Sequence, residues 1–149
     1  MQDEMLEQLQ RYYALWKESK HIYNQWAKSQ GLSANSLLIL YSFYSDGEER
    51  TQKAISQKWS IPKQTVNTIL KKFEQQGYIE LLSMPADKRN KQIRLTPAGQ
   101  TFTNTIIERL YAKELHVMQK MGLDHITSMN DDLALFIKLF REGGTEEHE

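Results

Sequence analysis

The sequence has no cysteine, few chain-breaking residues and no long apolar run. The lack of cysteine excludes disulfides, thiolate metal sites, cysteine nucleophiles and thiol-based peroxide sensing. Three prolines and seven glycines among 149 residues leave room for long helices. The polar start "MQDEMLEQLQ" is unlike a signal peptide, and no stretch approaches the roughly 18 apolar residues that cross a bilayer. We therefore expect one cytoplasmic domain that does not contact a membrane.

Net charge is also lacking, since 19 basic residues balance 19 acidic ones. The charges are nevertheless unevenly placed. Nine bases oppose three acids between Thr51 and Leu95, a net charge of +6, so the rest of the chain carries −6. The asymmetry favours a polyanion-binding middle flanked by acidic parts with another role. The nine bases are Lys53, Lys58, Lys63, Lys71, Lys72, Lys88, Arg89, Lys91 and Arg94.

The first third of the chain has helical periodicity. From Met5 to Trp26, apolar residues recur at spacings of three and four, which predicts one amphipathic helix. Gly31 is suited to end this helix, and Ser33 to cap the next. The segment from Leu37 to Tyr44 is apolar around most of its circumference, which predicts a helix that is buried on more than one side.

A turn at Asp46 and Gly47 is followed by two short helical patterns. Thr51 is the expected cap of the first, whose inward side chains are Ala54, Ile55 and Trp59. The second begins at Pro62, has apolar residues at i, i+3, i+4 and i+7 (Val66, Ile69, Leu70 and Phe73), and ends at Gly77. Joined by about four residues, the pair is a helix-turn-helix.

The segments "YIELLS" and "KQIRLT" predict two strands on either side of a basic turn. Thr96 and Pro97 then form a cap and first turn that open a long helix through about Met121. A last apolar helix is expected from about Asn130 to Arg141, and its exposed face would pack on the first helix or on a partner subunit. The predicted fold is mainly α (α+β), a winged helix-turn-helix.

In a winged helix the second helix enters the major groove of DNA and the hairpin loop reaches the minor groove. Gln64, Asn67 and Thr68 have the donors and acceptors that groove readout needs, while Lys63, Thr65 and Lys71 suit phosphates. Thr51 and Gln52 are expected to add phosphate contacts, because free backbone amides gather at a helix start. A solvated, lysine-rich surface is the alternative interpretation of the same face.

The turn contributes Asp87, Lys88, Arg89, Asn90 and Lys91 to the expected DNA contacts. Arg89 is the candidate for the minor groove, where negative potential is focused. Asp87 is unexpected beside DNA because phosphates repel a carboxylate. We expect it to orient Arg89 or to fix the turn by an Asx-type hydrogen bond.

The stretch from Asp87 to Gly99 resembles the MarR family of winged-helix transcription regulators. The similar pattern is Asp87, any residue, Arg89, three residues, Ile93, any residue, Leu95, Thr96, two residues and Gly99. The preceding "TQKAISQKWSIPKQTVNTILKKFEQQGYIE" and the long flanking helices also resemble the family. Trp59 and Pro62 depart from it, since the family more often has an aliphatic and a small polar residue there.

The resemblance implies a homodimer on a palindromic DNA operator, commonly released by a small aromatic or phenolic ligand. We expect a repressor without a cofactor. The implied layout of the single domain has dimerisation helices at 1–32 and 97–141, a DNA-binding region at 33–96 and a flexible tail at 142–149. Candidate ligand-binding residues are the aromatics Tyr12, Tyr13, Trp16, Tyr41 and Tyr44, for which plain core packing is the alternative.

Other classes of protein find less support in the sequence. Four histidines, His21, His116, His125 and His148, do not form a zinc-binding motif. Nucleophile-base pairs, paired carboxylates and glycine-rich phosphate loops are also missing, so we expect neither an enzyme nor a metal site. Two alternatives remain: a helical oligomeric adaptor whose basic turn binds an acidic protein, and an architectural DNA-binding protein without sequence preference.

Overall fold

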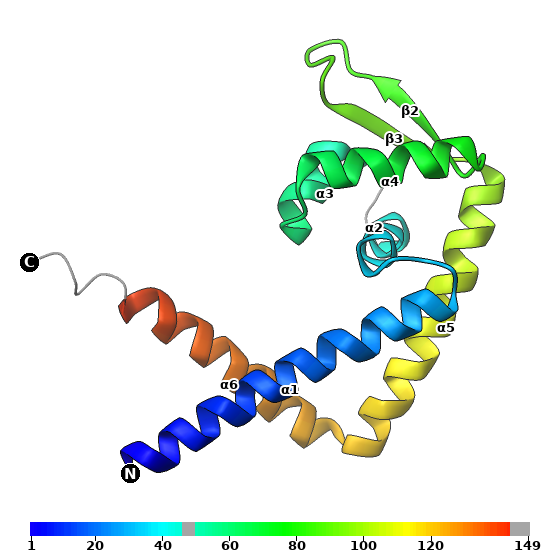
Figure 1. The fold of residues 1–149 in the computed structure, drawn as a ribbon. Coiled ribbons are helices and arrows are strands. Elements are labelled where there is room, and N and C mark those ends of the chain that lie inside the picture. The colour runs from blue at the N-terminus through cyan, green and yellow to red at the C-terminus, as the bar shows by residue number, and fades with distance from the viewer. Residues whose placement is uncertain (46–49, 144–149) are drawn as a thin grey trace, which may run out of the picture. The chain divides into compact units, whose positions relative to one another are not determined.

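The computed structural model describes residues 1–45 and 50–143, and it confirms the mainly helical winged-helix fold (Figure 1). The predicted turn at Asp46 and Gly47 and residues 144–149 of the expected tail lie outside the described residues. The elements are α1 (Gln2–Ser29), α2 (Ala34–Ser45), β1 (Arg50–Thr51), α3 (Gln52–Trp59), α4 (Lys63–Gln75), β2 (Ile79–Ser83), β3 (Lys91–Leu95), α5 (Pro97–Met121) and α6 (Leu123–Glu142). None of the described helices is long and apolar enough to span a membrane.

The chain divides into two compact units, Met1–Ile107 and Glu108–Glu149, and the division falls inside α5. The first unit has one core, formed where α2, α3, α4 and the strands meet. The hydrophobic periods of the sequence account for it, because the buried side chains lie three or four apart on the helices. Its fully buried large side chains are Ile39, Leu40, Phe43, Val66, Leu70, Phe73, Ile79, Ile93 and Ile107.

The ends of α1 and α2 follow the expected capping chemistry. Gly31 has φ +76°, a left-handed conformation that suits glycine and turns the chain out of α1. The Ser33 hydroxyl oxygen accepts the backbone amide of Ser36 at 3.1 Å, which caps α2 as predicted.

The helix-turn-helix is confirmed at α3 and α4. Thr51 caps α3, since its Oγ1 accepts the backbone amide of Ala54 at 3.1 Å. The inward face of α3 differs from the prediction: Ile55 is buried and Trp59 half-buried, but Ala54 is exposed. Ala54 is in the first turn, whose position in the helix is fixed by the cap rather than by packing.

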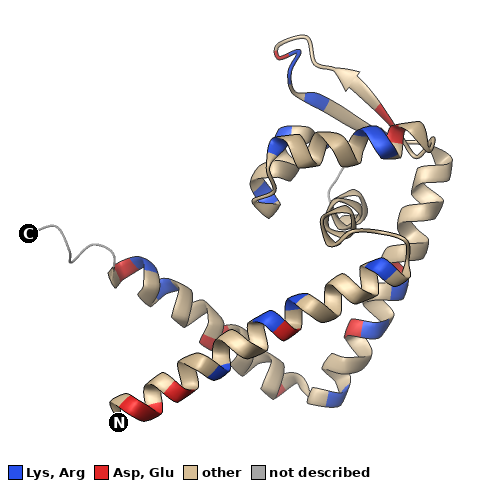
Figure 2. Cartoon of the chain, in the orientation of Figure 1, with Lys and Arg blue, Asp and Glu red and all other residues tan. Residues whose placement is uncertain are grey.

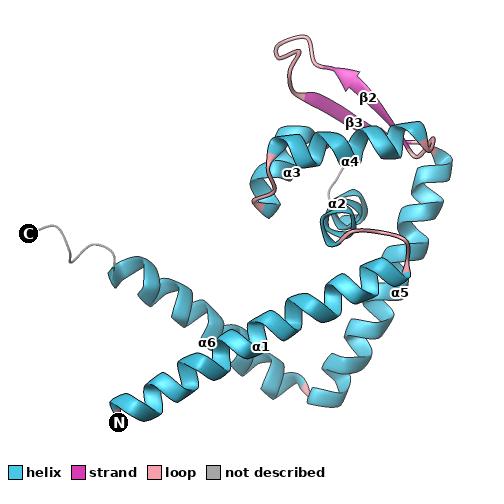
Figure 3. Ribbon diagram, viewed as in Figure 1, coloured by secondary structure: helices cyan, strands magenta, loops and turns pink. Residues whose placement is uncertain are grey.

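The predicted strands β2 and β3 form an antiparallel hairpin, with Ile79 opposite Leu95 and Ser83 opposite Lys91 (Figure 3). A third strand, β1, was not predicted. It pairs with the other side of β3, so the sheet order is β1-β3-β2. Two residues are too short to show a period of two, which is why the sequence pattern does not reveal β1.

The start of α5 is joined closely to the end of α4. Thr96 accepts the backbone amide of Gly99 at 3.0 Å as the predicted cap, and its hydroxyl donates to the carbonyl of Gly77 at 2.6 Å. Gly99 lies against the backbone of Tyr78: a Cβ atom at Gly99 would lie 1.8 Å from the Tyr78 carbonyl oxygen. Only glycine permits this approach.

In the second unit, α6 begins at Leu123, so the expected start near Asn130 was wrong. Gly122, with φ +88°, separates α6 from α5. The residues just after it are mostly polar, and helical periodicity in apolar residues therefore becomes visible only later in the chain. No residue of α6 is buried, although all of its residues are described.

Candidate nucleic-acid interface

The helix α4 has two distinct faces. Val66, Leu70 and Phe73 are buried in the core, which leaves the predicted DNA-contacting side chains on the outer face. Of these, Lys63, Gln64, Thr68 and Lys71 are exposed, while Thr65 and Asn67 are half-buried. Figure 2 shows Lys and Arg on α4 and on the adjoining hairpin. The predicted readout residues thus share one accessible helix face with the predicted phosphate-binding lysines.

One readout side chain already has an internal partner. The Thr68 hydroxyl donates to the backbone carbonyl of Gln64 at 2.9 Å, a common bond within helices. This bond uses the hydroxyl proton, so the oxygen of the exposed Thr68 can act towards another group only as an acceptor. Thr68 is therefore suited to accept from an exocyclic amine or to contact a thymine methyl group.

The first turn of α3 is occupied by side chains rather than open to phosphate. Thr51 Oγ1 accepts a hydrogen bond from the backbone amide of Ala54, and the backbone amide of Lys53 donates to Asn90 Oδ1 at 3.1 Å. The expectation that free amides gather there was wrong for these two groups. Phosphate contacts by the side chains of Thr51 and Gln52 remain predictions.

The expected Asx-type bond of Asp87 is confirmed. Its Oδ1 accepts the backbone amide of Arg89 at 3.1 Å, and its carbonyl accepts the amide of Asn90 at 3.2 Å. The carboxylate therefore closes the turn and does not need to face DNA. The sequence indicated this role because Asp commonly binds the backbone two residues onward.

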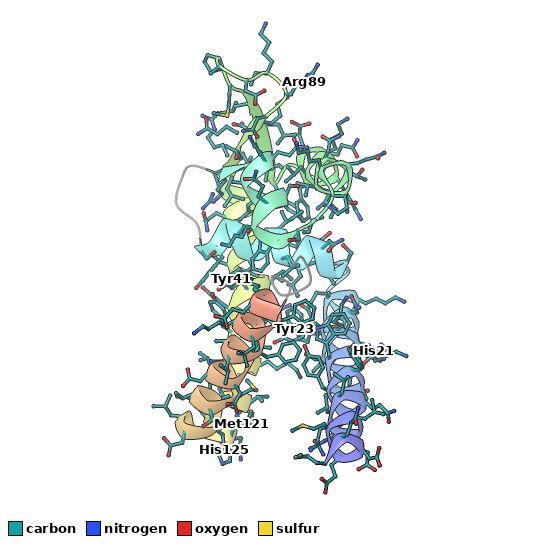
Figure 4. All side chains as sticks on the ribbon, turned by 90° about the vertical axis from the view of Figure 1, so that its left-hand side faces the viewer. His21, Tyr23, Tyr41, Arg89, Met121 and His125 are labelled. Atoms are coloured by element: carbon teal, nitrogen blue, oxygen red, sulfur yellow. The ribbon has the colours of Figure 1, made fainter. Side chains whose placement is uncertain are left out.

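The basic residues of the hairpin have different surroundings. Lys91 Nζ donates to Ser83 Oγ at 3.0 Å, and Arg94 Nε donates to Glu80 Oε2 at 2.8 Å across the strands. Lys88 and Arg89 are exposed beyond them, and Figure 4 shows Arg89 at the hairpin tip. Within the described residues, neither forms an ion pair. Among the four basic residues of the hairpin, these two are therefore the most available to a polyanion.

The comparisons with known proteins agree with this arrangement. Residues 30–90, from the end of α1 to the hairpin tip, match the MarR family. The HTH-type transcriptional regulator Hpr of Bacillus licheniformis is 28% identical over 145 residues, covering 85% of this chain and 69% of the relative. The solved structure of NMB1585, a MarR family regulator from Neisseria meningitidis, is 29% identical, with a TM-score of 0.76 over 95% of this chain and 97% of that chain. The chain is thus similar to MarR family regulators over most of its length.

Relatives of this kind are transcription regulators and not enzymes. The crystal structure of the S. aureus MepR-DNA complex also has a similar fold, with a TM-score of 0.69. The structural match covers 87% of this chain and 94% of the MepR chain. At 18% identity this likeness concerns the fold alone. The fold that presents α4 and the hairpin is therefore one that another protein uses in a complex with DNA.

The two departures from the MarR pattern have structural consequences. Trp59 Nε1 donates to the buried hydroxyl of Ser42 at 2.6 Å, and its ring meets Tyr41 edge-on at 5.6 Å. An aliphatic side chain at Trp59 would leave the Ser42 hydroxyl without this donor. Pro62 precedes α4 with φ −55° and is exposed, so it is compatible with the helix start while lacking an amide.

The candidate ligand residues lie on two helices of the first unit. On α1 the rings of Tyr12 and Tyr13 are 5.8 Å apart, and Lys20 Nζ lies 4.7 Å from the Trp16 ring. On α2, Tyr41 packs on Trp59, and Tyr44 is 37% exposed. Tyr41 thus takes part in packing between α2 and α3, as the core interpretation expects, and a ligand role for the five residues remains a prediction.

Sequence reasoning missed the link between Asn90 and Lys53, although it placed Asn90 among the DNA contacts. No local pattern reveals a bond between residues 37 positions apart.

In the described part of the chain, no three His, Asp or Glu side chains are grouped to hold a metal ion. His148 lies outside it.

Proposed function

We propose that this chain is a MarR-family transcription regulator, a homodimeric repressor that binds a palindromic operator and is released from it by a small aromatic ligand. The observation that carries the proposal is the joint exposure of the α4 polar face and of Arg89 at a turn closed by Asp87. Two adjacent grooves can be contacted at once by such a pair of elements.

Base readout is assigned to Gln64, Asn67 and Thr68 on α4. An amide side chain can pair with adenine through one donor and one acceptor, and the exposed Thr68 provides an acceptor oxygen and a methyl group. Lys63, Thr65 and Lys71 are assigned to phosphates, which fix register without reading sequence. The wing residues Lys88, Arg89 and Lys91 are assigned to the neighbouring minor groove and its phosphates.

Dimerisation is supported by apolar helix faces that remain uncovered in each unit taken by itself. In the first unit, the exposed side chains of α1 include Met5, Leu6, Tyr13, Leu15 and Trp16, each more than half exposed. In the second, Leu133, Phe136, Ile137 and Phe140 form a stripe on α6 and are all exposed. Exposed apolar area of this kind marks a protein interface, and we assign residues 1–32 and 97–141 to it.

Ligand release is supported by the aromatic side chains of α1 and α2. An aromatic effector requires flat rings with polar edges to pack against. The candidate residues with such rings are Tyr12, Tyr13, Trp16, Tyr41 and Tyr44. Titrating a panel of phenolic compounds into the protein-DNA complex tests this part. Release by none of them would leave the core interpretation of these residues in place.

Selecting duplexes from a random pool with the purified protein tests DNA recognition. We expect an enriched inverted repeat whose half-sites are centred about one helical turn apart, with affinity that falls steeply with salt. Equal binding to selected and random duplexes would instead indicate an architectural protein. Failure to bind any duplex, together with capture by an acidic protein, would favour the adaptor.

A further inference from the structure

The wing is joined to α3 by a side-chain hydrogen bond. The backbone amide of Lys53, in the first turn of α3, donates to Asn90 Oδ1 at 3.1 Å. The pairing of β1 with β3 brings the two residues together, because Thr51 lies opposite Gln92. Asn90 therefore stands just beyond the last backbone pair of this ladder and continues it with a side chain.

The turn that presents Asn90 is itself closed. Asp87 accepts the backbone amides of Arg89 and Asn90, through Oδ1 and the carbonyl oxygen respectively. The backbone amides of Arg89 and of the next residue are thus both hydrogen-bonded, whereas the Arg89 side chain is exposed (Figure 4). Fixing Asn90 against α3 consequently fixes the place from which Arg89 extends.

On the α3 side, Asn90 satisfies a group that the helix cannot satisfy. The first amides of a helix have no partner within it and attract an acceptor oxygen. Thr51 supplies the acceptor for Ala54, and Asn90 supplies the one for Lys53. Asn90 is therefore a second cap of α3, contributed by the wing.

We propose that Asn90 is a positioning residue for Arg89: its side chain anchors the wing to α3 and does not read a base. The proposal rests on the proposed function, in which Arg89 enters the minor groove. Without the anchor, the wing tip is held only by β2 and β3 and samples more positions. Arg89 must then be ordered upon binding, and the operator is bound more weakly.

Hydrogen exchange in the DNA-free protein tests the anchor itself. Asn90→Ala removes the acceptor, and we expect the Lys53 amide to exchange roughly three- to tenfold faster, the factor expected for one lost hydrogen bond. Asn90→Asp retains an acceptor oxygen at the helix start and should keep this amide protected. The matched control is Lys88→Ala, in the same turn, which should leave Lys53 unchanged. Unchanged exchange in Asn90→Ala would overturn the anchor.

A double-mutant cycle on the selected duplex tests the positioning of Arg89. Asn90→Ala is expected to raise Kd roughly three- to tenfold in the wild-type background and to have little effect when Arg89→Ala is already present. Lys88→Ala, which removes only charge, should weaken binding by a similar factor in both backgrounds. Asn90 and Lys88 are therefore expected to differ in their energetic coupling to Arg89, even if the two single substitutions raise Kd by the same factor.

The outcomes separate this inference from the proposed function. If Arg89→Ala weakens binding and Asn90→Ala costs the same factor in both backgrounds, Asn90 contacts DNA directly and the positioning role is wrong. Full affinity in Asn90→Ala also overturns it. If Arg89→Ala itself binds normally, the minor-groove role fails, and positioning fails with it, while exchange at Lys53 still decides whether the anchor exists.

Discussion

Arg89 differs from Asp87 and Asn90 in that its exposed side chain forms no hydrogen bond or ion pair within the described residues. Asp87 and Asn90 use their polar groups within the protein, to close the turn and to cap α3. The sequence does not distinguish the tasks of Arg89 and Asn90, because both side chains are suited to bind DNA. The carboxylate of Asp87 was the informative exception, because only an internal role explains it beside a polyanion.

Replacing Arg89 with alanine should weaken operator binding by about 1 to 3 kcal/mol, the cost of one specific DNA contact. Fluorescence anisotropy on the selected duplex, at moderate and at high salt, measures the loss. Lys88→Ala is the control: it should weaken binding evenly across sequences and lower the salt slope by about one. Unchanged affinity in Arg89→Ala would remove this residue from the minor groove.

Gly99 is the second residue whose identity is determined by its surroundings. An added methyl group would collide with the Tyr78 carbonyl oxygen, a backbone atom that cannot move aside as a flexible side chain would. Gly99→Ala should lower the free energy of unfolding by about 2 to 3 kcal/mol, the range of overpacking. Urea denaturation measures it.

The matched control for this substitution is Gly143→Ala. A Cβ atom at Gly143 meets nothing within 4 Å, and its φ of −65° suits alanine. Stability should therefore stay within about 0.5 kcal/mol of wild type, as for other surface substitutions. Equal stability of the two alanine variants would mean that α5 can move away from Tyr78 without cost.

Among the elements, the turn between α3 and α4 contains a strained residue. Ser60 has φ +51°, the left-handed region, and is the one described non-glycine residue with positive φ. Around it, Ser56 Oγ donates to the Ile61 carbonyl at 2.7 Å and the Ile61 amide donates to the Ser56 carbonyl at 3.1 Å. These bonds hold the turn in a conformation that a side chain disfavours.

Ser60→Gly should therefore stabilise the protein, by about 0.5 to 1 kcal/mol, since relief of left-handed strain exceeds the entropy lost by glycine. Ser60→Val, which is β-branched, should destabilise it. Thermal unfolding of both variants gives the order of stability. A lower melting temperature for Ser60→Gly than for wild type would contradict the strain.

Elements with strong local signals were predictable from the sequence. The caps at Thr51, Ser33 and Thr96 follow from residue type, and α4 follows from the spacing of its apolar residues. Features that depend on distant partners were not predictable. Thus β1 needs β3 as its partner strand, and the Asn90 anchor needs a residue 37 positions away.

At the scale of the whole molecule, the feature to be explained is the apolar surface that each unit, taken by itself, leaves uncovered. Phe136 and Phe140 of α6 are 42% and 77% exposed, and Tyr13 and Trp16 of α1 are 59% and 56% exposed. A monomer that leaves so many aromatic side chains in water would aggregate. In the proposed homodimer, a partner subunit of the same sequence would remove them from water.

We expect light scattering to give twice the chain mass of 17.5 kDa. Phe136→Glu should shift the protein to monomer at micromolar concentration, because burying an unpaired carboxylate in an apolar interface costs several kcal/mol. Asp131→Lys also changes charge on α6, but its position lies away from the apolar stripe, so it should stay dimeric. A wild-type monomer, or a dimeric Phe136→Glu, would contradict the assignment of α6 to the interface.

The bond between Lys53 and Asn90 also bears on the order in which the protein folds. It closes a loop that contains α3, α4 and β2, and a loop of this length must lose conformational entropy before its ends can meet. The helices need no such closure for their own hydrogen bonds. The wing tip is therefore expected to form last in its unit and to open first, so that a protease cuts the hairpin loop while the helical core is still intact.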